Sequence, residues 1–501
     1  MLLDDVVTAL KSISLLQTLA IPLFVYTIWS CISSWYRLRH FPGPFLGAVS
    51  SLWLVKVWVS NQQGKGYENV NREYNSRLVR VGPNDLMTDD PDIIRHMNGV
   101  RSGYSRSNWY YPSRIDPYQR GLFNHTDNAV HDKLRAKVAH GFQGKMNISM
   151  EADVDQQVHE LIQLIKSKYI SKGDGPFKPI DMAMSVAYFT LDSFTKIAYG
   201  KPFGFLTTDS DVYSYIQTLE ESVPPVVLAS DLPLLGSIMF SPWILKLIGP
   251  KTTDKKGAGV ILRLAKEVVA ERFDNPEAKP KNDMLGAFIK AGCTQGECQT
   301  EVPFQLIAGS DTTATAIRAT LLQLAANRQA YAKLQKEIDT AISDGRISSP
   351  ITAEEGKHLE YLQAVIYEGL RMQVPFTGLL SKEVPPQGDT INGQFIPGGT
   401  RIGHNSCGMQ LRADIFGEDV DVFRPERWLV ADPARKAKMV QTTELVFGYG
   451  RWQCLGKSIA FMEMVKVYVE VCLSTLENIS VFFGGMCELT KDLNRTVTAT
   501  V

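Results

Sequence analysis

The longest helical pattern in the chain lies between Phe304 and Ile342, and it limits what the chain can fold into. Apolar residues recur there at helical spacing over about ten turns, well beyond the usual length of a globular helix. We therefore expect this segment to run as one helix through the middle of the molecule.

The segments that follow predict more helix and a little sheet. Thr352 to Glu355 reads TAEE, a capping box, and LEYLQAVIYEGLRM after it has the apolar spacing of a second helix. Between Glu383 and Gly403, Pro and Gly surround short alternating runs that are typical of strands and turns. The sequence predicts a mainly α fold with small sheets.

Composition narrows the kinds of partner. Lys plus Arg and Asp plus Glu both total 53 in 501 residues, so no net charge points to nucleic acid. The chain is 44% apolar and 10% aromatic, as in an ordered globular protein. Seven cysteines are too few and too scattered for a disulfide scaffold, which favours a reducing compartment.

The amino terminus predicts a membrane anchor. From Ser12 to Tyr36 no residue is charged and most are apolar, enough for a helix to cross a bilayer. The basic Arg37 and Arg39 follow it, which predicts a cytosolic location for the rest of the chain. We expect a luminal terminus at 1–11, a transmembrane helix at 12–36, a basic, proline-rich hinge at 37–48 and a cytosolic domain at 49–501. A cleaved signal peptide and a buried helix are the alternatives.

One cysteine lies in a glycine-rich loop, FGYGRWQCLG, at residues 447–456. Gly448, Gly450 and Gly456 would let the backbone approach a flat cofactor, and N–H groups at the start of a following helix would stabilise a thiolate at Cys454. The alternative is a buried cysteine in a glycine-rich turn.

With this loop the chain resembles the cytochrome P-450 family of haem-thiolate monooxygenases, from the anchor to the carboxyl terminus. It is most similar to fungal members such as the pisatin demethylase-like group. The resemblance implies a P-450 fold, haem b as cofactor and Cys454 as the axial ligand of its iron.

The family's loop has Phe seven residues before the ligand, Gly four before, Arg or His two before and Gly two after. Phe447, Gly450 and Gly456 match this pattern. Trp452 departs from it, which leaves open whether Trp452 donates one hydrogen bond to a haem propionate or Arg451 reaches around to do so.

The long helical segment carries AGSDTT, which is similar to the family's oxygen-activation motif. Small Ala308 and Gly309 would leave space beside the helix for dioxygen. Thr312 can bond back to a carbonyl of the preceding turn, and with Asp311 and water it can relay protons. Alternatively, these polar residues only form a solvated or kinked turn.

Three further motifs match the family. Glu368 and Arg371 stand three residues apart on a helix, and Arg427 in FRPERW completes the family's Glu–Arg–Arg cluster, a structural support for the haem pocket. His131 and Arg135 match a helix that contacts haem propionates; an exposed polar helix face is the alternative. Lys382 takes the place of a propionate-binding arginine, although lysine lacks the bidentate fork.

The resemblance also implies partners. The chain has no flavin or nicotinamide fingerprint, so we expect electrons from an NADPH-dependent cytochrome P-450 reductase, with cytochrome b5 as a further candidate. A basic patch for docking would comprise Arg435, Lys436, Lys438, Arg451 and Lys457. The apolar region from Ser222 to Trp243 favours an apolar substrate and access from the membrane; plain packing is the alternative.

The expected function is that of a monooxygenase anchored in the endoplasmic reticulum membrane that oxidises an apolar organic substrate of secondary metabolism. The same fold could instead carry out desaturation, ring formation or isomerisation. A haem-binding membrane carrier or sensor without enzymatic activity is a further alternative. The substrate is not evident from the sequence.

Overall fold

The computed structural model describes residues 15–60, 62–114, 116, 118–142, 144, 149–170, 178–274 and 281–474. Helices dominate them, and the predicted mainly α fold with small sheets is confirmed. The helices of the amino-terminal half are α2 (Leu15–Leu38), α3 (Phe45–Val49), α4 (Leu52–Val59), α5 (Gln63–Glu68), α6 (Val70–Glu73), α7 (Pro91–Asn98), α8 (Asn128–Val138), α9 (Met150–Leu164), α10 (Met182–Tyr199), α11 (Phe205–Thr208), α12 (Tyr215–Asp231), α13 (Pro233–Met239) and α14 (Pro242–Ile248).

The carboxyl-terminal half continues in the same way. Its helices are α15 (Ala258–Phe273), α16 (Met284–Lys290), α17 (Gln295–Ala326), α18 (Arg328–Ser343), α19 (Ala353–Lys357), α20 (Glu360–Met372), α21 (Ser406–Gln410), α22 (Ala413–Phe416), α23 (Pro433–Thr443) and α24 (Lys457–Ser474). Short helical turns include η1 (Asn108–Ser113), η2 (Leu122–Asn124), η6 (Pro425–Trp428), η7 (Glu444–Phe447) and η8 (Gly450–Trp452).

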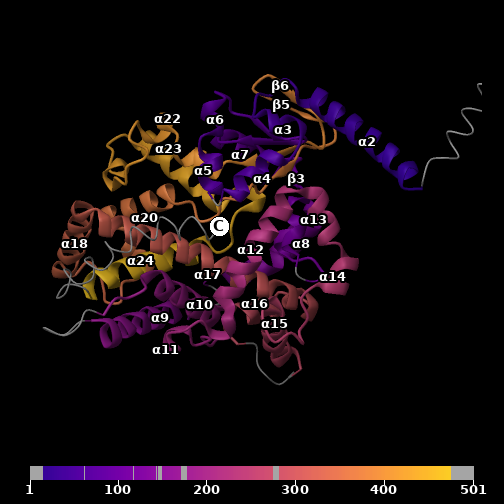
Figure 1. Ribbon diagram of the computed structural model, residues 1–501. Coiled ribbons are helices and arrows are strands. Elements are labelled where there is room, and N and C mark those ends of the chain that lie inside the picture. Colours follow the sequence, from indigo (N-terminus) through magenta and orange to yellow (C-terminus); the bar gives the residue numbers. More distant parts are fainter. Residues whose placement is uncertain are drawn as a thin grey trace, which may run out of the picture.

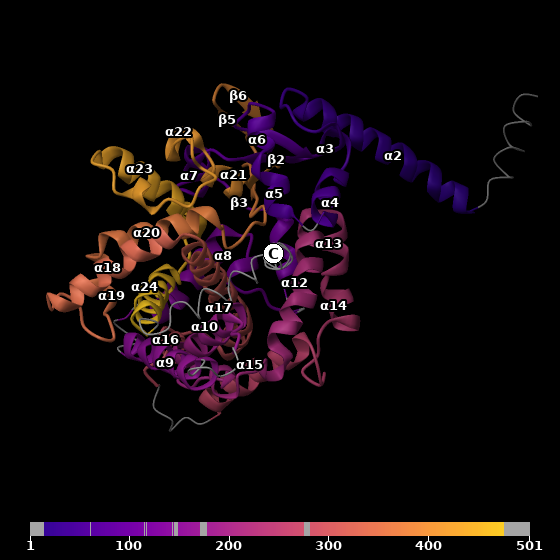
Figure 2. The same ribbon diagram turned by 60° about the vertical axis from the view of Figure 1, so that its left-hand side comes forward.

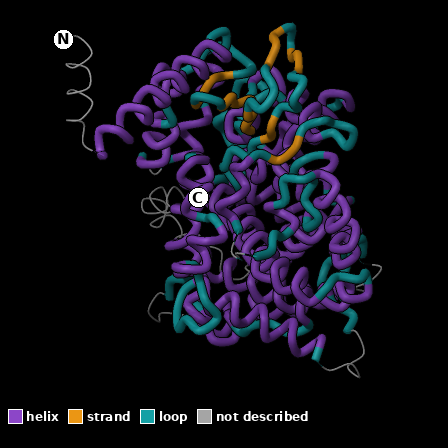
Figure 3. The backbone as a smooth tube through the Cα atoms, turned by 90° about the vertical axis from the view of Figure 1, so that its right-hand side faces the viewer, coloured by secondary structure: helices purple, strands orange, loops and turns teal. Residues whose placement is uncertain are grey.

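The strands gather at one end of the molecule, as the orange segments in Figure 3 show. A five-stranded sheet has the order β1 (Val79–Gly82), β2 (Asp85–Thr88), β7 (Arg401–His404), β4 (Lys382–Glu383) and β3 (Ser105–Arg106). β2 and β7 run parallel, and the other neighbours run antiparallel. β5 (Asp389–Ile391) and β6 (Gln394–Ile396) form a separate hairpin. The sheet thus places Lys382 and Arg106 on paired strands.

The long helix α17 lies at the centre of the helical part (Figure 1). It packs against α10, α15, α20 and α24, and its residues contribute to the largest apolar core. A capping box formed by Thr294 and Glu297 starts this helix, which explains why it begins before the apolar pattern does.

The prediction of one continuous helix from Phe304 to Ile342 is wrong at one point. The helix breaks at Asn327, and α18 begins at the next residue. Asn327 leaves the helical conformation, and its side-chain oxygen accepts a hydrogen bond from the N–H of Ala330, so it caps α18. A polar cap inside an uninterrupted apolar pattern explains the discrepancy. The other capping box, at Thr352 and Glu355, is confirmed.

The predicted transmembrane helix at 12–36 lies only partly within the described residues, which begin at Leu15. Among the described residues, no helix has both the length and the apolar character that crossing a membrane requires. Residues 1–14, which include the predicted luminal terminus, lie outside the described residues. The described part of the apolar segment forms α2, which contains Pro22 and continues beyond the predicted end to Leu38.

The end of α2 is attached to the protein, which is the physical reason for its extension. The Arg80 guanidinium donates to the carbonyl oxygens of Ser34 and Trp35 at 2.9 and 3.3 Å, and the side chain of Leu38 is fully buried. Residues 41–44 then leave the helical conformation, as expected of FPGP, before α3 begins at Phe45. The predicted hinge thus packs against the sheet.

Candidate functional site

The loop before Cys454 is shaped by two glycines with positive φ. Gly448 and Gly450 have φ of 73° and 55°, a region that disfavours any side chain. A Cβ on Gly448 would lie 2.7 Å from the carbonyl oxygen of Trp452, and one on Gly450 would lie 2.4 Å from that of Asn98. The loop is closed by the Cys454 N–H, which donates to the carbonyl oxygen of Phe447 at 2.7 Å.

The Cys454 sulfur lies at the amino end of α24. Its side chain is accessible, yet partial burial raises the pKa of the thiol above its usual value. The N–H groups of Gly456 and Lys457 and the positive charge of Arg135 act in the opposite direction and favour the thiolate. The geometry therefore offers an accessible sulfur and, in backbone N–H groups, a means of stabilising its negative charge.

The motif on α17 has the local geometry expected for Thr312. Its hydroxyl donates to the carbonyl oxygen of Ala308 at 2.8 Å, which is the bond to the preceding turn that the sequence predicts. Ala308 itself is exposed. Burial raises the pKa of the adjacent Asp311 carboxyl, and the Arg318 guanidinium opposes this rise. Asp311 therefore keeps its proton to a higher pH than an ordinary aspartate.

Gly309 allows close packing against another helix. A Cβ there would lie 2.4 Å from the Phe194 ring on α10, so the missing side chain makes room for a packed aromatic ring. The sequence could not show this because the contact joins two distant helices. The small residue that faces open space is Ala308.

His131 lies on α8, and one of its ring nitrogens has no hydrogen-bond partner among the described residues. Its ring is fully buried, Nδ1 lies 3.0 Å from a carboxylate oxygen of Asp132, and Nε2 has no hydrogen-bond partner. Burial, and then the charge of Arg106, lower the pKa of His131 to about 4. The ring is therefore neutral at physiological pH, and because the Asp132 carboxylate can only accept a hydrogen bond, its one proton lies on Nδ1 and Nε2 is left as an acceptor.

Lys382 is also buried, at 1% exposure. Its ammonium group donates to the Tyr110 hydroxyl at 2.9 Å and to the carbonyl oxygen of Leu380 at 3.1 Å. Burial lowers the pKa of Lys382 well below its usual value. A carboxylate beside this ammonium would restore its charge.

Arg106 and Tyr110 belong to the same group of side chains, and the sequence reasoning missed both. Arg106 is 7% exposed, its Nε has no hydrogen-bond partner, and burial lowers its pKa to about 10. No carboxylate among the described residues lies within ion-pair distance of Arg106 or Lys382. Arg106 on β3 lies opposite Lys382 on β4, and Tyr110 of η1 bonds to the same lysine. These contacts join segments far apart in the chain, so no local sequence pattern signals them.

These observations fit a haem group. Its two propionates would supply the carboxylates that the buried cations lack, and a propionate beside the unpartnered Nε2 of His131 would favour a second proton on the ring and so a hydrogen bond from that nitrogen. Cys454 is an accessible sulfur that can bind iron as the thiolate. The residues present therefore suit an acidic, planar iron cofactor.

The Glu–Arg–Arg cluster is confirmed as a geometric unit. The Glu368 carboxylate accepts from Arg371 at 2.8 and 2.9 Å and from Arg427 at 2.9 Å, and all three side chains are at most 2% exposed. Arg371 also donates to the carbonyl oxygens of Gln410 and Val420. The cluster thus links the helix α20 to residues 410–427, which precede the cysteine loop.

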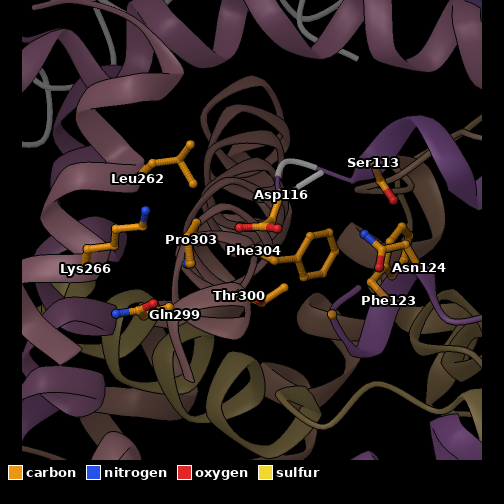
Figure 4. Close-up of a pocket in the computed structure, with 11 residues that line it drawn as sticks. Ser113, Asp116, Phe123, Asn124, Leu262, Lys266, Gln299, Thr300, Pro303 and Phe304 are labelled. Carbon is orange, nitrogen blue, oxygen red and sulfur yellow. The ribbon is translucent and has the colours of Figure 1, made fainter. Parts of the chain in front are cut away.

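A small pocket lies beside the amino-terminal half of α17 (Figure 4). Leu262 and Lys266 of α15 form one side, and residues near η1 and η2 form the other. The Phe304 ring stacks on Phe123 at 4.6 Å between ring centres. The other residues that line the pocket are Ser113, Asp116, Gly121, Asn124, Gln299, Thr300 and Pro303.

The fold and the cysteine site together define a haem-thiolate class of protein, and the sequence comparison agrees with it. The family model described as Cytochrome P450 matches residues 42–478. The chain belongs to the cytochrome P450 family and is a cytochrome P450 monooxygenase.

Similar proteins come from fungi. The chain is 50% identical over 477 residues to "Cytochrome P450 monooxygenase ABA1" of Pyricularia oryzae. The aligned region covers 94% of this chain and 93% of the relative. It is 40% identical over 436 residues to "Cytochrome P450 monooxygenase aba1" of Botryotinia fuckeliana, with 87% and 85% covered. It is 38% identical over 450 residues to "Cytochrome P450 monooxygenase abl1" of Leptosphaeria maculans, with 89% and 79% covered.

Proposed function

We propose that this enzyme binds haem b through the Cys454 thiolate and oxidises an apolar organic substrate of secondary metabolism. Dioxygen is the oxidant, and the electrons come from NADPH through a separate cytochrome P450 reductase, with cytochrome b5 as a further donor. The supporting observation is the accessible Cys454 sulfur at the start of α24, two residues after Trp452, whose ring lies against the buried cations Arg106 and Lys382. The fungal relatives support a role in specialised metabolism.

The bound haem supplies dioxygen binding and O–O cleavage, which an anionic sulfur ligand favours. The chain supplies the protons that this cleavage consumes. Burial raises the pKa of the Asp311 carboxyl, so it holds its proton to a higher pH than an ordinary aspartate and is suited to the first step of a proton relay. Thr312 directly follows Asp311 in the chain, and its hydroxyl is oriented by the hydrogen bond to the Ala308 carbonyl. This hydroxyl can pass a proton on through water.

The assay for this function combines the enzyme, the reductase, NADPH and a metabolite extract of the source organism. We expect mass spectrometry to detect a product that has gained an oxygen atom. Thr312→Ala should lower the ratio of product formed to NADPH consumed by roughly tenfold because proton delivery is lost. Thr312→Ser, which keeps the hydroxyl, is the control. Unchanged coupling in Thr312→Ala would remove the relay role, and absence of an oxygenated product would contradict the function.

The side chains that line the small pocket beside α17 support an apolar substrate. Phe123, Phe304, Leu262 and Pro303 offer apolar contact, and the polar groups lie among them. Pockets of this mixed kind bind mainly apolar molecules and orient them through a few hydrogen bonds. We therefore expect an apolar substrate with at least one polar group.

The reductase docks on the face that carries α23. Arg435, Lys436 and Lys438 are exposed there, as a docking patch requires. The other two predicted patch residues are already paired: Arg451 with Asp132 at 3.1 Å and Lys457 with Glu444 at 2.8 Å. In the same assay, neutralising the three α23 cations should slow turnover more at low than at high ionic strength.

The enzyme associates with the endoplasmic reticulum membrane on its cytosolic side through exposed apolar side chains. α2, α13 and α14 lie on the same side of the molecule in Figures 1 and 2. Side chains on all three are largely exposed, among them Phe24 at 65%, Leu234 at 77%, Trp243 at 72% and Ile248 at 75%. Contact with lipid would remove this apolar area from water.

Vesicle flotation tests this membrane contact. The double variant Trp243→Ser with Leu247→Ser should weaken binding to phosphatidylcholine vesicles roughly tenfold or more because two large apolar side chains are lost. Val422→Ser, which removes an exposed apolar side chain outside these helices, is the control. Equal flotation of the double variant and the wild type would contradict contact through α14.

A further inference from the structure

Trp452 stands at the centre of a group of basic side chains. The ring centre of Trp452 lies 4.5 Å from the Arg106 guanidinium carbon, 5.4 Å from the Lys382 nitrogen and 4.3 Å from the His131 ring centre. Trp452 itself is 9% exposed. An indole face attracts a cation within about 6 Å, and most strongly where water is excluded.

Arg106 is held in this place from its other sides as well. Its Nη1 donates to the carbonyl oxygen of Leu122 at 2.5 Å, while the N–H of the same Leu122 donates to the Glu301 carboxylate at 2.5 Å. The backbone of Leu122 thus connects a buried carboxylate on α17 to the guanidinium. The rings of Tyr110 and Phe123 lie 4.8 and 5.2 Å from the guanidinium carbon. Arg106 is therefore positioned before any ligand binds.

Arg451 does not fill the same position. Its Nε donates to Asp132 at 3.1 Å, and its Nη2 donates to the carbonyl oxygen of Val100 at 2.9 Å. Its guanidinium carbon is 5.9 Å from the Trp452 ring centre, farther than that of Arg106. Arg451 already has an anionic partner, whereas the Nε of Arg106 has no partner at all.

We infer that Arg106, stacked on Trp452, supplies the cation that the haem-thiolate loop pattern places at position 452. Trp452 is a positioning residue: in place of a charged side chain at 452 it offers an aromatic ring, and the guanidinium of Arg106 on β3 stacks on that ring. An arginine at 452 would place two guanidinium groups side by side in a buried site, which costs free energy. Tryptophan and Arg106 are therefore a matched pair. This inference rests on the proposed binding of haem.

Haem retention measures the contribution of Arg106. The holoenzyme is mixed with excess apomyoglobin, and haem transfer is followed by absorbance. Arg106→Gln should release haem roughly tenfold or more faster than the wild type because a charge-assisted contact to a propionate is lost. Arg106→Lys should lie between them. Arg120→Gln, which removes a similar arginine stacked 4.8 Å from the Tyr111 ring, should behave as the wild type.

Variants at position 452 separate positioning from simple packing. Trp452→Ala should release haem faster and shift the propionate-bending band of the resonance Raman spectrum in the same direction as Arg106→Gln, whereas Trp452→Phe should keep both close to wild type. The double variant Arg106→Gln with Trp452→Arg moves the cation back to 452 and should release haem more slowly than Arg106→Gln alone.

The outcomes distinguish this inference from the proposed function. Haem release from Arg106→Gln at the wild-type rate, with an unshifted propionate band, would overturn the inference even though the wild type binds haem through a thiolate. A double variant no better than Arg106→Gln would equally contradict the exchange of roles. A wild type that shows no thiolate-bound haem would instead remove the proposed function.

Discussion

Replacing Glu368 with glutamine is expected to lower the free energy of unfolding by about 3–5 kcal/mol, because it leaves two buried guanidinium groups without their shared anion. The Glu368 carboxylate is fully buried and also accepts from the Trp428 indole N–H and the Arg424 backbone N–H, at 2.9 and 2.8 Å. An amide in its place has no charge and would point an N–H donor at other donors.

Urea unfolding followed by tryptophan fluorescence measures this loss. The control is Asp92→Asn, which removes one partner of the exposed Arg95 ion pair at 2.8 Å, where Asp92 is 90% exposed. Solvent screens that pair, so its loss should be much smaller. A Glu368→Gln protein as stable as the wild type would show that the cluster is not a structural support for the segment before the cysteine loop.

Replacing Cys454 with serine is expected to abolish product formation while leaving the fold intact. Serine is similar in size and keeps the backbone bond from residue 454 to the Phe447 carbonyl, so the loop should persist. It cannot provide a thiolate, and a neutral hydroxyl does not give iron the electron density that favours O–O cleavage. Reductase-supported turnover and the urea midpoint, measured on the same preparation, test both halves of this expectation.

Cys407→Ser is the matched control for that experiment. Cys407 is half-buried and lies on α21, outside the residues assigned to the cysteine site. Its loss should leave turnover at the wild-type level. Turnover in Cys454→Ser equal to that of Cys407→Ser would contradict the ligand role of Cys454.

The parts of the site that could be predicted are those fixed within one element. Thr312 bonds to Ala308 four residues earlier, and Glu368 meets Arg371 three residues later, because helical spacing alone brings these groups together. The glycines before Cys454 likewise adopt positive φ within a single loop. Local periodicity and turn chemistry carry this information in the sequence.

The parts that could not be predicted depend on contacts between distant elements. Arg106 lies opposite Lys382 because β3 pairs with β4 in a sheet whose order is not apparent from spacing, and both cations lie over Trp452 of the distant cysteine loop. Gly309 is needed because Phe194 of another helix packs there. The break at Asn327 is a different failure: the apolar pattern continues across it, and the cap on α18 is evident only from the geometry.

The most direct test of the account is the absorption spectrum of the reduced, carbon monoxide-treated wild-type enzyme. Coordination of haem iron by the Cys454 thiolate predicts the strongly red-shifted Soret band that is typical of this ligand, and predicts that the band is lost in Cys454→Ser. A wild-type Soret band at the position of histidine-ligated haem proteins, or a red-shifted band that persists without the sulfur at 454, would contradict the assignment.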